Sequence, residues 1–549
     1  MKRHKLILLL MIPLLLRPLS AAADSAGPKT RVEASGYTET SSYGEVLAFL
    51  REIQVRSDQV RVRSLTTSAE GRMVPLVIVS RESISDPSQR AAIPKPAVLV
   101  MANIHAGEVE GKESSLMMIR DLAVGPLRHL LERQVLLFLP IYNADGNDRF
   151  GHNRRDDGPE LAGLRANGQN LDLNRDYMKL EAPETRGLLS LFRAWDPILT
   201  VDMHTTNGSY HREPVTYAGM AHPSTSRLLQ DYFWQKLTAG AADALQSKYG
   251  YESVPYGNFM DRLQPEKGWL NDAMEARYGT NYIGLRNRFA LLDENYSYAD
   301  FKTRVLASYA YLRSILEFTD RHIGEMAELA YRADRETARD YAREKAAVEF
   351  KIEELMKVTV RSYEFAREEM PAAGSPAERG GPGRYRLRRT ETLRDYRIPY
   401  FSLAVPTRVL PLPEEGYVIL PGQAEAIAIL RSHGILLEKF AEPLRVTEAE
   451  NFKITAMELS RTIYQGRIAL TLRGEYQKGE VLIPENAYFI SLHQPLARLV
   501  PLLLEPEIPD SLAAWGFFNR AIVPQWSNTF SLYPVYRLAR RPAVAMVAE

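Results

Sequence analysis

Short apolar runs that alternate with helical stretches dominate the N-terminal half of the chain. Ala97–Ile104, Val135–Tyr142 and Ile198–Met203 are continuous and rich in Val, Ile and Leu, which is typical of strands buried on both faces. Glu113–Ala123 and Pro183–Trp195 separate these runs along the chain and place apolar residues at helical spacing. This alternation predicts an α/β domain in which helices flank a mixed central sheet.

The chain has 549 residues, which is too many for one hydrophobic core. Changes in composition predict an α/β domain at 24–325, a helical connector with a Pro- and Gly-rich linker at 326–384, and a smaller C-terminal accessory domain at 385–549. The charged stretch Glu325–Phe365 lacks Pro and Gly and is predicted to be helical, and Pro371–Gly383 is predicted to be the linker. Short β-like runs with one helix-like patch predict an α+β or mostly β accessory domain.

Residues 1–23 have the three parts of a secretory signal. A basic start is followed by the apolar run Leu6–Leu16 and by the small residues Ser20–Ala23. The apolar run is shorter than the roughly 20 residues that span a membrane, and it contains Pro13. We therefore expect export from a bacterial cell to the periplasm or the medium, with no stable membrane span once the signal is cleaved.

The charge balance and the absence of cysteine narrow the possible partners and sites. Lys and Arg number 69 against 68 Asp and Glu, so no net positive field favours nucleic acid as a partner. Because the chain has no Cys, structural disulfides and thiolate metal ligands are excluded. Any transition metal must therefore be bound by His and carboxylate side chains.

Three potential metal ligands follow two of the predicted strands. His105 and Glu108 come directly after the run Ala97–Ile104, and His204 comes directly after the run that ends at Met203. Because open α/β sheets bind ligands at the carboxyl ends of their strands, we expect these three side chains to converge. Two imidazoles and one carboxylate, with a fourth position left open, are typical of a catalytic zinc site. The same ligands would also accept cobalt, manganese or iron.

Further motifs accompany these ligands. In chain order the sequence has the elements His-x-x-Glu, Asn-x-Asp-Gly, Arg-x-Asn, Asp-Leu-Asn-Arg, a lone His after a strand and a late Glu, which begin at His105, Asn143, Arg165, Asp172, His204 and Glu294. In these elements the chain resembles the zinc carboxypeptidase family, the relatives of carboxypeptidase A, over about residues 40–320. The resemblance implies a metallocarboxypeptidase whose C-terminal extension lies outside the catalytic domain, and the N-terminal signal predicts its export.

The resemblance implies that one zinc ion per chain is bound by His105, Glu108 and His204. Glu294 then corresponds to the general base that takes a proton from water activated by the metal. Its neighbour Asp293 competes for this role. The two side chains would face opposite ways on a strand, and the family motif places a glutamate at position 294.

The resemblance also assigns three residues to the substrate. Arg165 corresponds to the residue that polarises the scissile carbonyl and stabilises the oxyanion. Asn174 and Arg175 correspond to the pair that binds a terminal carboxylate, for which a planar guanidinium beside an amide is suited. Taken alone, these two residues could instead cap a turn and pair with a surface acid. Tyr278 and Tyr282 are the candidates for the mobile tyrosine that the family places over the substrate carboxylate.

Three functions are compatible with these motifs. The first is a zinc-dependent metallocarboxypeptidase that hydrolyses the last bond of peptides with a free C-terminus. The second is a zinc amidohydrolase that deacylates N-acyl amino acids, because such relatives share the metal ligands and the Asp-Leu-Asn-Arg motif. The third is a catalytically silent protein that binds peptides or glycans, and the presence of Glu294 argues against it. The side-chain preference and the oligomeric state stay open.

Overall fold

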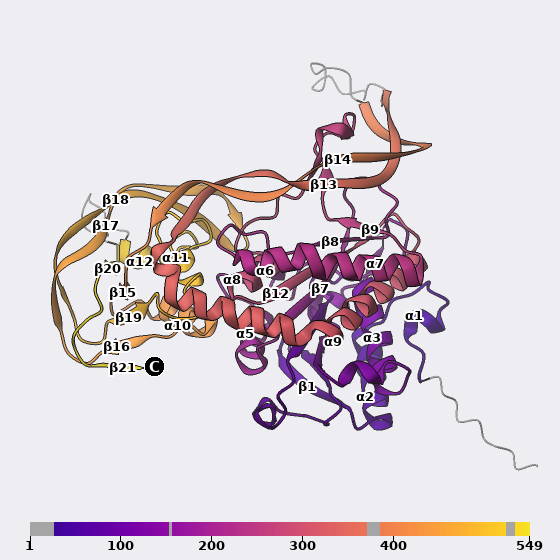
Figure 1. Cartoon of the computed structure of the whole chain (residues 1–549), viewed down its shortest axis with the longest axis horizontal. Coiled ribbons are helices and arrows are strands. Elements are labelled where there is room, and N and C mark those ends of the chain that lie inside the picture. The colour runs from indigo at the N-terminus through magenta and orange to yellow at the C-terminus, as the bar shows by residue number, and fades with distance from the viewer. Residues whose placement is uncertain (1–26, 153–155, 370–384, 523–532, 549) are drawn as a thin grey trace, which may run out of the picture.

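An eight-stranded mixed sheet forms the centre of the N-terminal part of the protein (Figure 1). The computed structural model describes residues 27–152, 156–369, 385–522 and 533–548. The strands, in spatial order, are β1 (Val60–Thr67), β2 (Met73–Val79), β4 (Val135–Leu139), β3 (Ala97–Ala102), β7 (Leu199–Thr206), β12 (Phe289–Tyr296), β8 (Val215–Ala218) and β9 (Ser253–Pro255). The four central strands from β4 to β12 run parallel, whereas β2 and β8 pair antiparallel with them. The predicted mixed α/β fold is confirmed.

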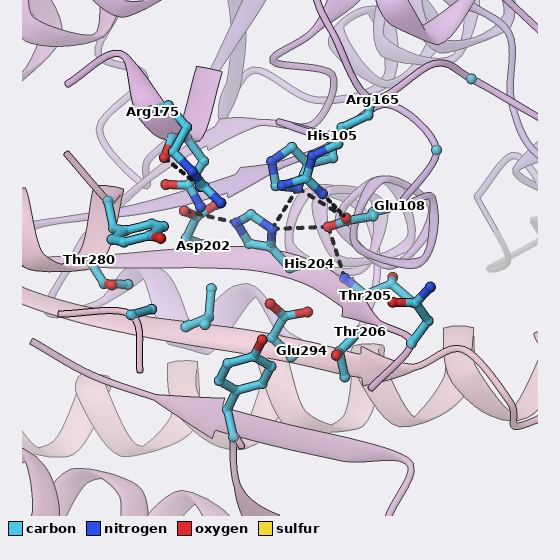
Figure 2. A pocket seen from close by; sticks show the side chains of 18 of the residues that line it. His105, Glu108, Arg165, Arg175, Asp202, His204, Thr205, Thr206, Thr280 and Glu294 are labelled. Carbon is cyan, nitrogen blue, oxygen red and sulfur yellow. Dashed lines mark hydrogen bonds and ion pairs between the residues drawn. The ribbon is translucent and has the colours of Figure 1, made fainter. Parts of the chain in front are cut away.

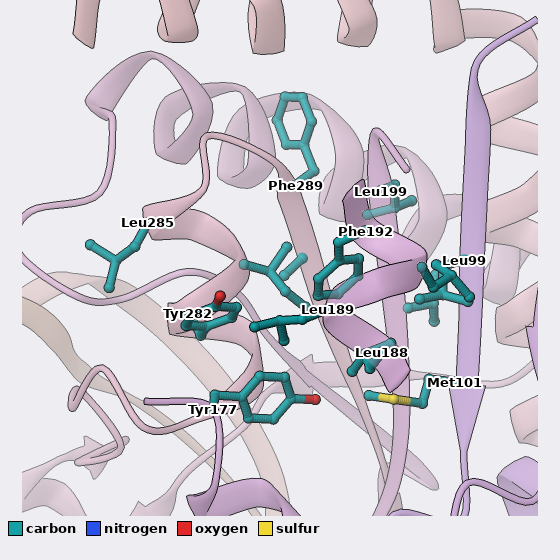
Figure 3. Close-up of a cluster of buried hydrophobic side chains, with 14 of the residues drawn as sticks. Leu99, Met101, Tyr177, Leu188, Leu189, Phe192, Leu199, Tyr282, Leu285 and Phe289 are labelled. Atoms are coloured by element: carbon teal, nitrogen blue, oxygen red, sulfur yellow. The ribbon is translucent and has the colours of Figure 1, made fainter. Parts of the chain in front are cut away.

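Helices cover both faces of this sheet. They are α2 (Tyr43–Arg56), α3 (Glu110–Ala123), α5 (Pro183–Trp195), α6 (Arg227–Tyr232), α7 (Thr238–Tyr249), α8 (Gly279–Leu285) and α9 (Phe301–Asp340). On one face α3 packs so closely on β7 that a Cβ added at Gly111 would lie 2.5 Å from the Cβ of Met203. On the other face, Leu189 of α5 and Tyr282 of α8 join Met101 of β3 in a buried cluster (Figure 3). The three predicted strands and both predicted helices are therefore confirmed.

A long antiparallel ribbon crosses the α/β part of the molecule (Figure 1). It consists of β13 (Lys345–Glu369) and β14 (Tyr385–Pro411). Two short strands, β11 (Trp269–Leu270) and β10 (Asn258–Phe259), extend it to a four-stranded sheet. Through β11 the ribbon is joined to the chain segment that leads into α8.

This ribbon corrects the helical prediction for Glu325–Phe365. The prediction holds up to the end of α9 at Asp340 and is wrong where β13 begins. Within β13, Val358 and Val360 are two positions apart and therefore lie on the same face of the strand, where they pack in a buried cluster with Trp269. Strand pairing and this burial outweigh the helical preference of the Glu, Lys and Ala residues in the segment.

The C-terminal part contains a seven-stranded sheet with short helices, as predicted for a mostly β or α+β region. The strands, in spatial order, are β18 (Arg467–Ile483), β17 (Leu444–Tyr464), β20 (Val535–Leu538), β15 (Gly416–Ile419), β19 (Tyr488–Ser491), β16 (Glu438–Phe440) and β21 (Met546–Ala548). The helices are α10 (Ala424–His433), α11 (Leu499–Leu504) and α12 (Asn519–Ile522). Helix α10 packs against α5, and one buried hydrophobic cluster includes Phe192 of α5 and Ile427 of α10. The C-terminal part is therefore packed on the α/β part.

Two predicted segments lie outside the described residues. These are the secretory signal at residues 1–23 and the whole of the predicted linker at Pro371–Gly383. In the ranges that the structure does describe, no helix is both long and apolar enough to cross a membrane.

Candidate active site

A tight turn after β3 carries His105 and Glu108. Asn103 follows β3 directly and takes a left-handed conformation with φ of 62°, which redirects the chain. Its side-chain amide donates hydrogen bonds of 3.3 Å to the carbonyl oxygens of Ala106 and Glu108. The turn therefore holds both potential ligands at the carboxyl end of β3, beside the parallel strand β7 that carries His204.

Three buried side chains face one another at this point (Figure 2). Nδ1 of His105 lies 3.0 Å from Oε1 of Glu108, and Nδ1 of His204 lies 3.0 Å from Oε2 of the same carboxylate. The two Nδ1 atoms are 3.2 Å apart. Since each of the three side chains is at most 6% exposed, water solvates none of them fully. The predicted metal ligands thus converge as expected.

Each imidazole has a second carboxylate at its other ring nitrogen. Nε2 of His105 lies 3.0 Å from Oδ1 of Asp172, and Nε2 of His204 lies 3.1 Å from Oδ2 of Asp202. A carboxylate at Nε2 favours the tautomer that carries its proton there. In that tautomer both Nδ1 lone pairs, which lie beside Glu108, are free to bind a metal ion. Such a donor set is complementary to a metal cation, so these residues fit a zinc ion.

The charges around this group also favour a cation. Burial alone would lower the pKa of His204, but the carboxylates of Asp202 and Glu108 raise it well above its ordinary value. Burial alone would raise the pKa of Glu108, but His105 and His204 lower it well below its ordinary value. The site therefore stabilises positive charge among its own side chains, and a metal ion supplies that charge without a proton.

Glu294 stands beside His204 on the neighbouring strand β12. The two residues are direct partners in the parallel β7–β12 pair, so their side chains leave the same face of the sheet. The adjacent Asp293 points to the opposite face, where its Oδ2 accepts a hydrogen bond of 3.5 Å from Ser308 of α9. Burial raises the pKa of Glu294 to about 8; the charge of His204 opposes this rise, and that of Glu108 adds to it. A carboxyl group with a pKa near neutrality can both accept and donate a proton.

Arg165 joins the ligand group through Asp172. Its Nε and Nη2 lie 3.0 and 2.9 Å from Oδ2 of Asp172, and its Nη1 lies 3.3 Å from Oε1 of Glu108. The Arg165 side chain is 51% exposed, which leaves part of the guanidinium open to the cavity. Oδ1 of Asp172 also accepts a hydrogen bond of 2.9 Å from the backbone N–H of Asn174. One carboxylate thus orients His105, Arg165 and the start of the next turn.

Asn174 and Arg175 reach the cavity from a short 3-10 turn. Oδ1 of Asn174 accepts a hydrogen bond of 2.8 Å from the backbone N–H of Gly279 at the start of α8. Nη1 of Arg175 donates to the carbonyl oxygen of Asn174 at 2.9 Å, and its guanidinium lies 4.3 Å from the ring centre of Tyr278. An arginine held by a carbonyl and an aromatic ring keeps its charge available for an anionic ligand.

The two tyrosine candidates have different surroundings. Tyr282 is fully buried, its hydroxyl lies 2.7 Å from Nδ1 of His433, and its ring centre lies 5.4 Å from that of Tyr177. Tyr278 lines the cavity and stacks with Arg175. Of the two, Tyr278 can contact a ligand in the cavity without disrupting the hydrophobic core.

A cavity of about 570 Å³ lies at this edge of the sheet and brings the predicted residues together. All seven line it, namely His105, Glu108, Arg165, Asn174, Arg175, His204 and Glu294. Its wall also contains residues that the sequence analysis missed, namely Asp202, Thr205, Thr206, Tyr256, Asp272 and Thr280. Figure 2 labels Asp202, Thr205, Thr206 and Thr280 among them. Asp202 has a sequence signal, because it stands two positions before His204 on a strand and hence on the same face. Tyr256, Asp272 and Thr280 come from later segments that carry no recognisable motif.

The family model for zinc carboxypeptidase matches residues 46–353, which is more than half of the chain. The chain belongs to the zinc carboxypeptidase family. The family that the motifs predicted is therefore confirmed. Membership makes the chain a metallopeptidase of the carboxypeptidase type, a hydrolase that acts on peptide bonds.

Relatives in this family extend the comparison. Carboxypeptidase 2 of Trichophyton rubrum is 25% identical over 490 residues, which cover 86% of this chain and 81% of that protein. Carboxypeptidase 2 of Trichophyton tonsurans is 26% identical over 494 residues, with the same coverage of 86% and 81%. These alignments are longer than the residues matched by the family model, so the similarity extends into the C-terminal part.

Solved structures of carboxypeptidases are also similar to the chain. A metallo-carboxypeptidase from Burkholderia cenocepacia is 20% identical, with a TM-score of 0.40, over 52% of this chain and 71% of that chain. Carboxypeptidase A from Helicoverpa armigera is 18% identical, with a TM-score of 0.39, over 54% of this chain and 75% of that chain.

Proposed function

We propose that this protein is a zinc-dependent carboxypeptidase that removes the C-terminal residue of peptides. The observation that carries the proposal is the convergence of His105, Glu108 and His204 at one cavity, with Glu294 beside them. In this proposal the first three residues hold one zinc ion per chain and Glu294 is the general base. The zinc, when bound, supplies a Lewis acid that polarises a carbonyl and makes water nucleophilic near neutral pH.

Glu294 moves the proton in the proposed reaction. Its carboxylate accepts a proton from the attacking water and then donates that proton to the nitrogen of the leaving residue. The position of Glu294 directly opposite His204 in the β7–β12 pair places this carboxylate next to the proposed ligands. Without a metal, burial raises the pKa of Glu294 to about 8; the positive charge of a bound metal would lower it, which favours the carboxylate form that accepts the first proton.

Arg165, Asn174 and Arg175 bind the substrate in the proposed complex. The guanidinium of Arg165, which Asp172 orients, donates to the oxygen that becomes negatively charged in the transition state. Asn174 and Arg175 bind the terminal carboxylate through charge-assisted hydrogen bonds. Binding the last carboxylate at one end of the cavity places the preceding peptide bond at the ligand group, which accounts for removal of single residues from the C-terminus.

A peptide library tests this proposal against the two other functions. Purified, zinc-loaded protein is incubated with a mixed library that has free C-termini, with the same library in amidated form, and with small N-acyl amino acids. If residues are released from the library with free C-termini and not from the amidated library, the result supports a carboxypeptidase. Hydrolysis of the N-acyl amino acids alone would assign the site to deacylation. Zinc binding without turnover of any of the three would assign it to a binding protein.

Replacement of Arg175 by alanine should mainly weaken substrate binding. Hydrogen bonds to charged groups contribute about 1.5–3 kcal/mol, so we expect KM for free-C-terminal peptides to rise about 10- to 100-fold with a smaller change in kcat. Steady-state kinetics on matched free and amidated peptides measure this, and the preference for the free form should shrink. Arg332, which is exposed on α9, provides the control, and Arg332→Ala should leave both constants unchanged. An unchanged KM in Arg175→Ala would remove this residue from the carboxylate site.

Export and the division of the chain also remain proposals. We propose that the segment 1–23 directs export to the periplasm or the medium and is cleaved. We further propose a catalytic domain at 24–325, a connector at 326–384 and an accessory domain at 385–549. N-terminal sequencing of protein recovered from each compartment tests the first proposal, and limited proteolysis tests the second.

A further inference from the structure

The turn between β17 and β18 reaches the active site from the C-terminal part of the chain. Tyr464 and Arg467 are paired across the two strands, and Gln465 and Gly466 form the turn with φ of 52° and 75°. Two consecutive residues with positive φ are typical of the tight hairpin turn that suits twisted strands. Gln465 adopts this conformation although it is not glycine, which points to a function for its side chain.

The side chain of Gln465 contacts the residue that supports the proposed zinc site. Its Oε1 accepts a hydrogen bond of 3.0 Å from the backbone N–H of Asp172, a residue 293 positions earlier in the chain. Asp172 in turn contacts Nε2 of His105 at 3.0 Å and the guanidinium of Arg165 at 2.9 Å. A displacement of the Asp172 backbone would therefore move its carboxylate, which contacts both the proposed metal ligand His105 and the oxyanion arginine Arg165.

The turn is held firmly on both sides. Nε of Arg467 lies 2.6 Å from Oε1 of Glu181, which follows the 3-10 turn of the active site. Nη1 of Arg467 donates a hydrogen bond of 2.8 Å to the carbonyl oxygen of Trp515, and the ring of Tyr464 stacks on that tryptophan. Arg467 thus connects the α/β part, through Glu181, with the C-terminal part, through Trp515. The position of Gln465 next to Asp172 therefore does not depend only on the hydrogen bond between these two residues.

We propose that Gln465 is a positioning residue of the active site, which holds Asp172 so that His105 and Arg165 are correctly aligned. The expected effect of Gln465 on kcat rests on the proposed function. Its expected effect on zinc binding can be measured without any turnover. Gln465 also gives the C-terminal part a role in the reaction, because the hydrogen-bond acceptor comes from the β17–β18 hairpin. Substitutions of outer residues that orient metal ligands typically change metal affinity or activity by 10- to 100-fold.

The variant Gln465→Gly tests this inference without endangering the turn. Glycine adopts positive φ readily, so the hairpin should fold at least as well while the acceptor for Asp172 is lost. We expect about tenfold weaker zinc binding in a competition titration and about tenfold lower kcat, with KM and the thermal midpoint of unfolding little changed. The variant Gln465→Glu retains an acceptor oxygen at the same reach and should recover most of the zinc affinity and of kcat.

A matched control comes from the same hairpin. Gln477 is exposed on β18 and far along the hairpin from the turn, so Gln477→Ala should behave as the parent protein. Parental zinc affinity and kcat in Gln465→Gly would overturn the inference. The inference would also be overturned if Gln465→Gly lost zinc affinity and kcat together with a lower thermal midpoint, and if Gln465→Glu failed to restore them. That result would assign the effect to hairpin folding. If the parent protein releases no residue from any peptide, the proposed function fails, and the zinc titration still decides the role of Gln465.

Discussion

Peptide hydrolysis should fall by at least about a thousandfold when His204 is replaced by alanine or when the metal is removed by a chelator, because a bound metal contributes several kcal/mol to the transition state. The geometry supports this expectation, since Nδ1 of His204 lies 3.2 Å from Nδ1 of His105 and 3.0 Å from Glu108. Added zinc should restore the chelated parent protein and should leave His204→Ala inactive. Residue release from a free-C-terminal peptide, with metal content measured in the same samples, checks both results.

Metal binding should also stabilise the fold. A ligand that binds only the folded state at a free concentration about a hundred times its Kd contributes about 2.7 kcal/mol, so the thermal midpoint of the parent protein should rise when zinc is added. The midpoint of His204→Ala should not respond. His129 is exposed and distant from the site, and His129→Ala should behave as the parent protein in both assays. Full activity of the parent protein after exhaustive chelation would contradict the metal-dependent mechanism.

Replacement of Glu294 by glutamine should reduce kcat by about 10²- to 10⁴-fold, which is the usual contribution of a general acid–base group. Glutamine has nearly the same shape but cannot accept the proton. Because Glu294 is not among the three proposed ligands, the variant should still bind zinc with the affinity of the parent protein. Single-turnover and steady-state kinetics, together with a zinc titration, separate the chemical step from metal binding.

Asp293 provides a stringent control for this variant. It is adjacent in sequence and points to the opposite face of β12, next to Ser308. Burial raises the pKa of Asp293 well above its ordinary value. Asparagine has nearly the same shape as aspartate, so Asp293→Asn should disturb the packing around this position little. We expect Asp293→Asn to keep kcat within a few-fold of the parent value. Loss of activity in Asp293→Asn combined with a fully active Glu294→Gln would reverse the assignment of the base.

Several features of the fold and site follow from local patterns in the sequence. The runs that form β3, β4 and β7 are apolar over their whole length, because strands in the middle of a parallel sheet are buried on both faces. His105 and Glu108 are close in sequence, and a single turn brings them together. The two-residue period of a strand predicts that Asp293 and Glu294 face opposite ways, and the family motif favours Glu294. In the structure Glu294 pairs with His204 across β7 and β12.

Other features depended on contacts between distant residues. Residues 345–369 have the composition of a helix and form a strand, because pairing with β14 and burial against Trp269 decide their conformation. Tyr278 and Tyr282 could not be distinguished by spacing, whereas packing against His433 removes Tyr282 from the cavity.

The sequence by itself determined the family, the α/β class and seven of the residues that line the cavity, because each depends on a short motif or on local periodicity. Only the tertiary structure decided what supports those residues. The hydrogen bond between Gln465 and Asp172 joins residues 293 positions apart, and neither residue type signals the contact. Such contacts are set by the packing of the C-terminal hairpin on the α/β part, and that packing is a property of the whole folded chain.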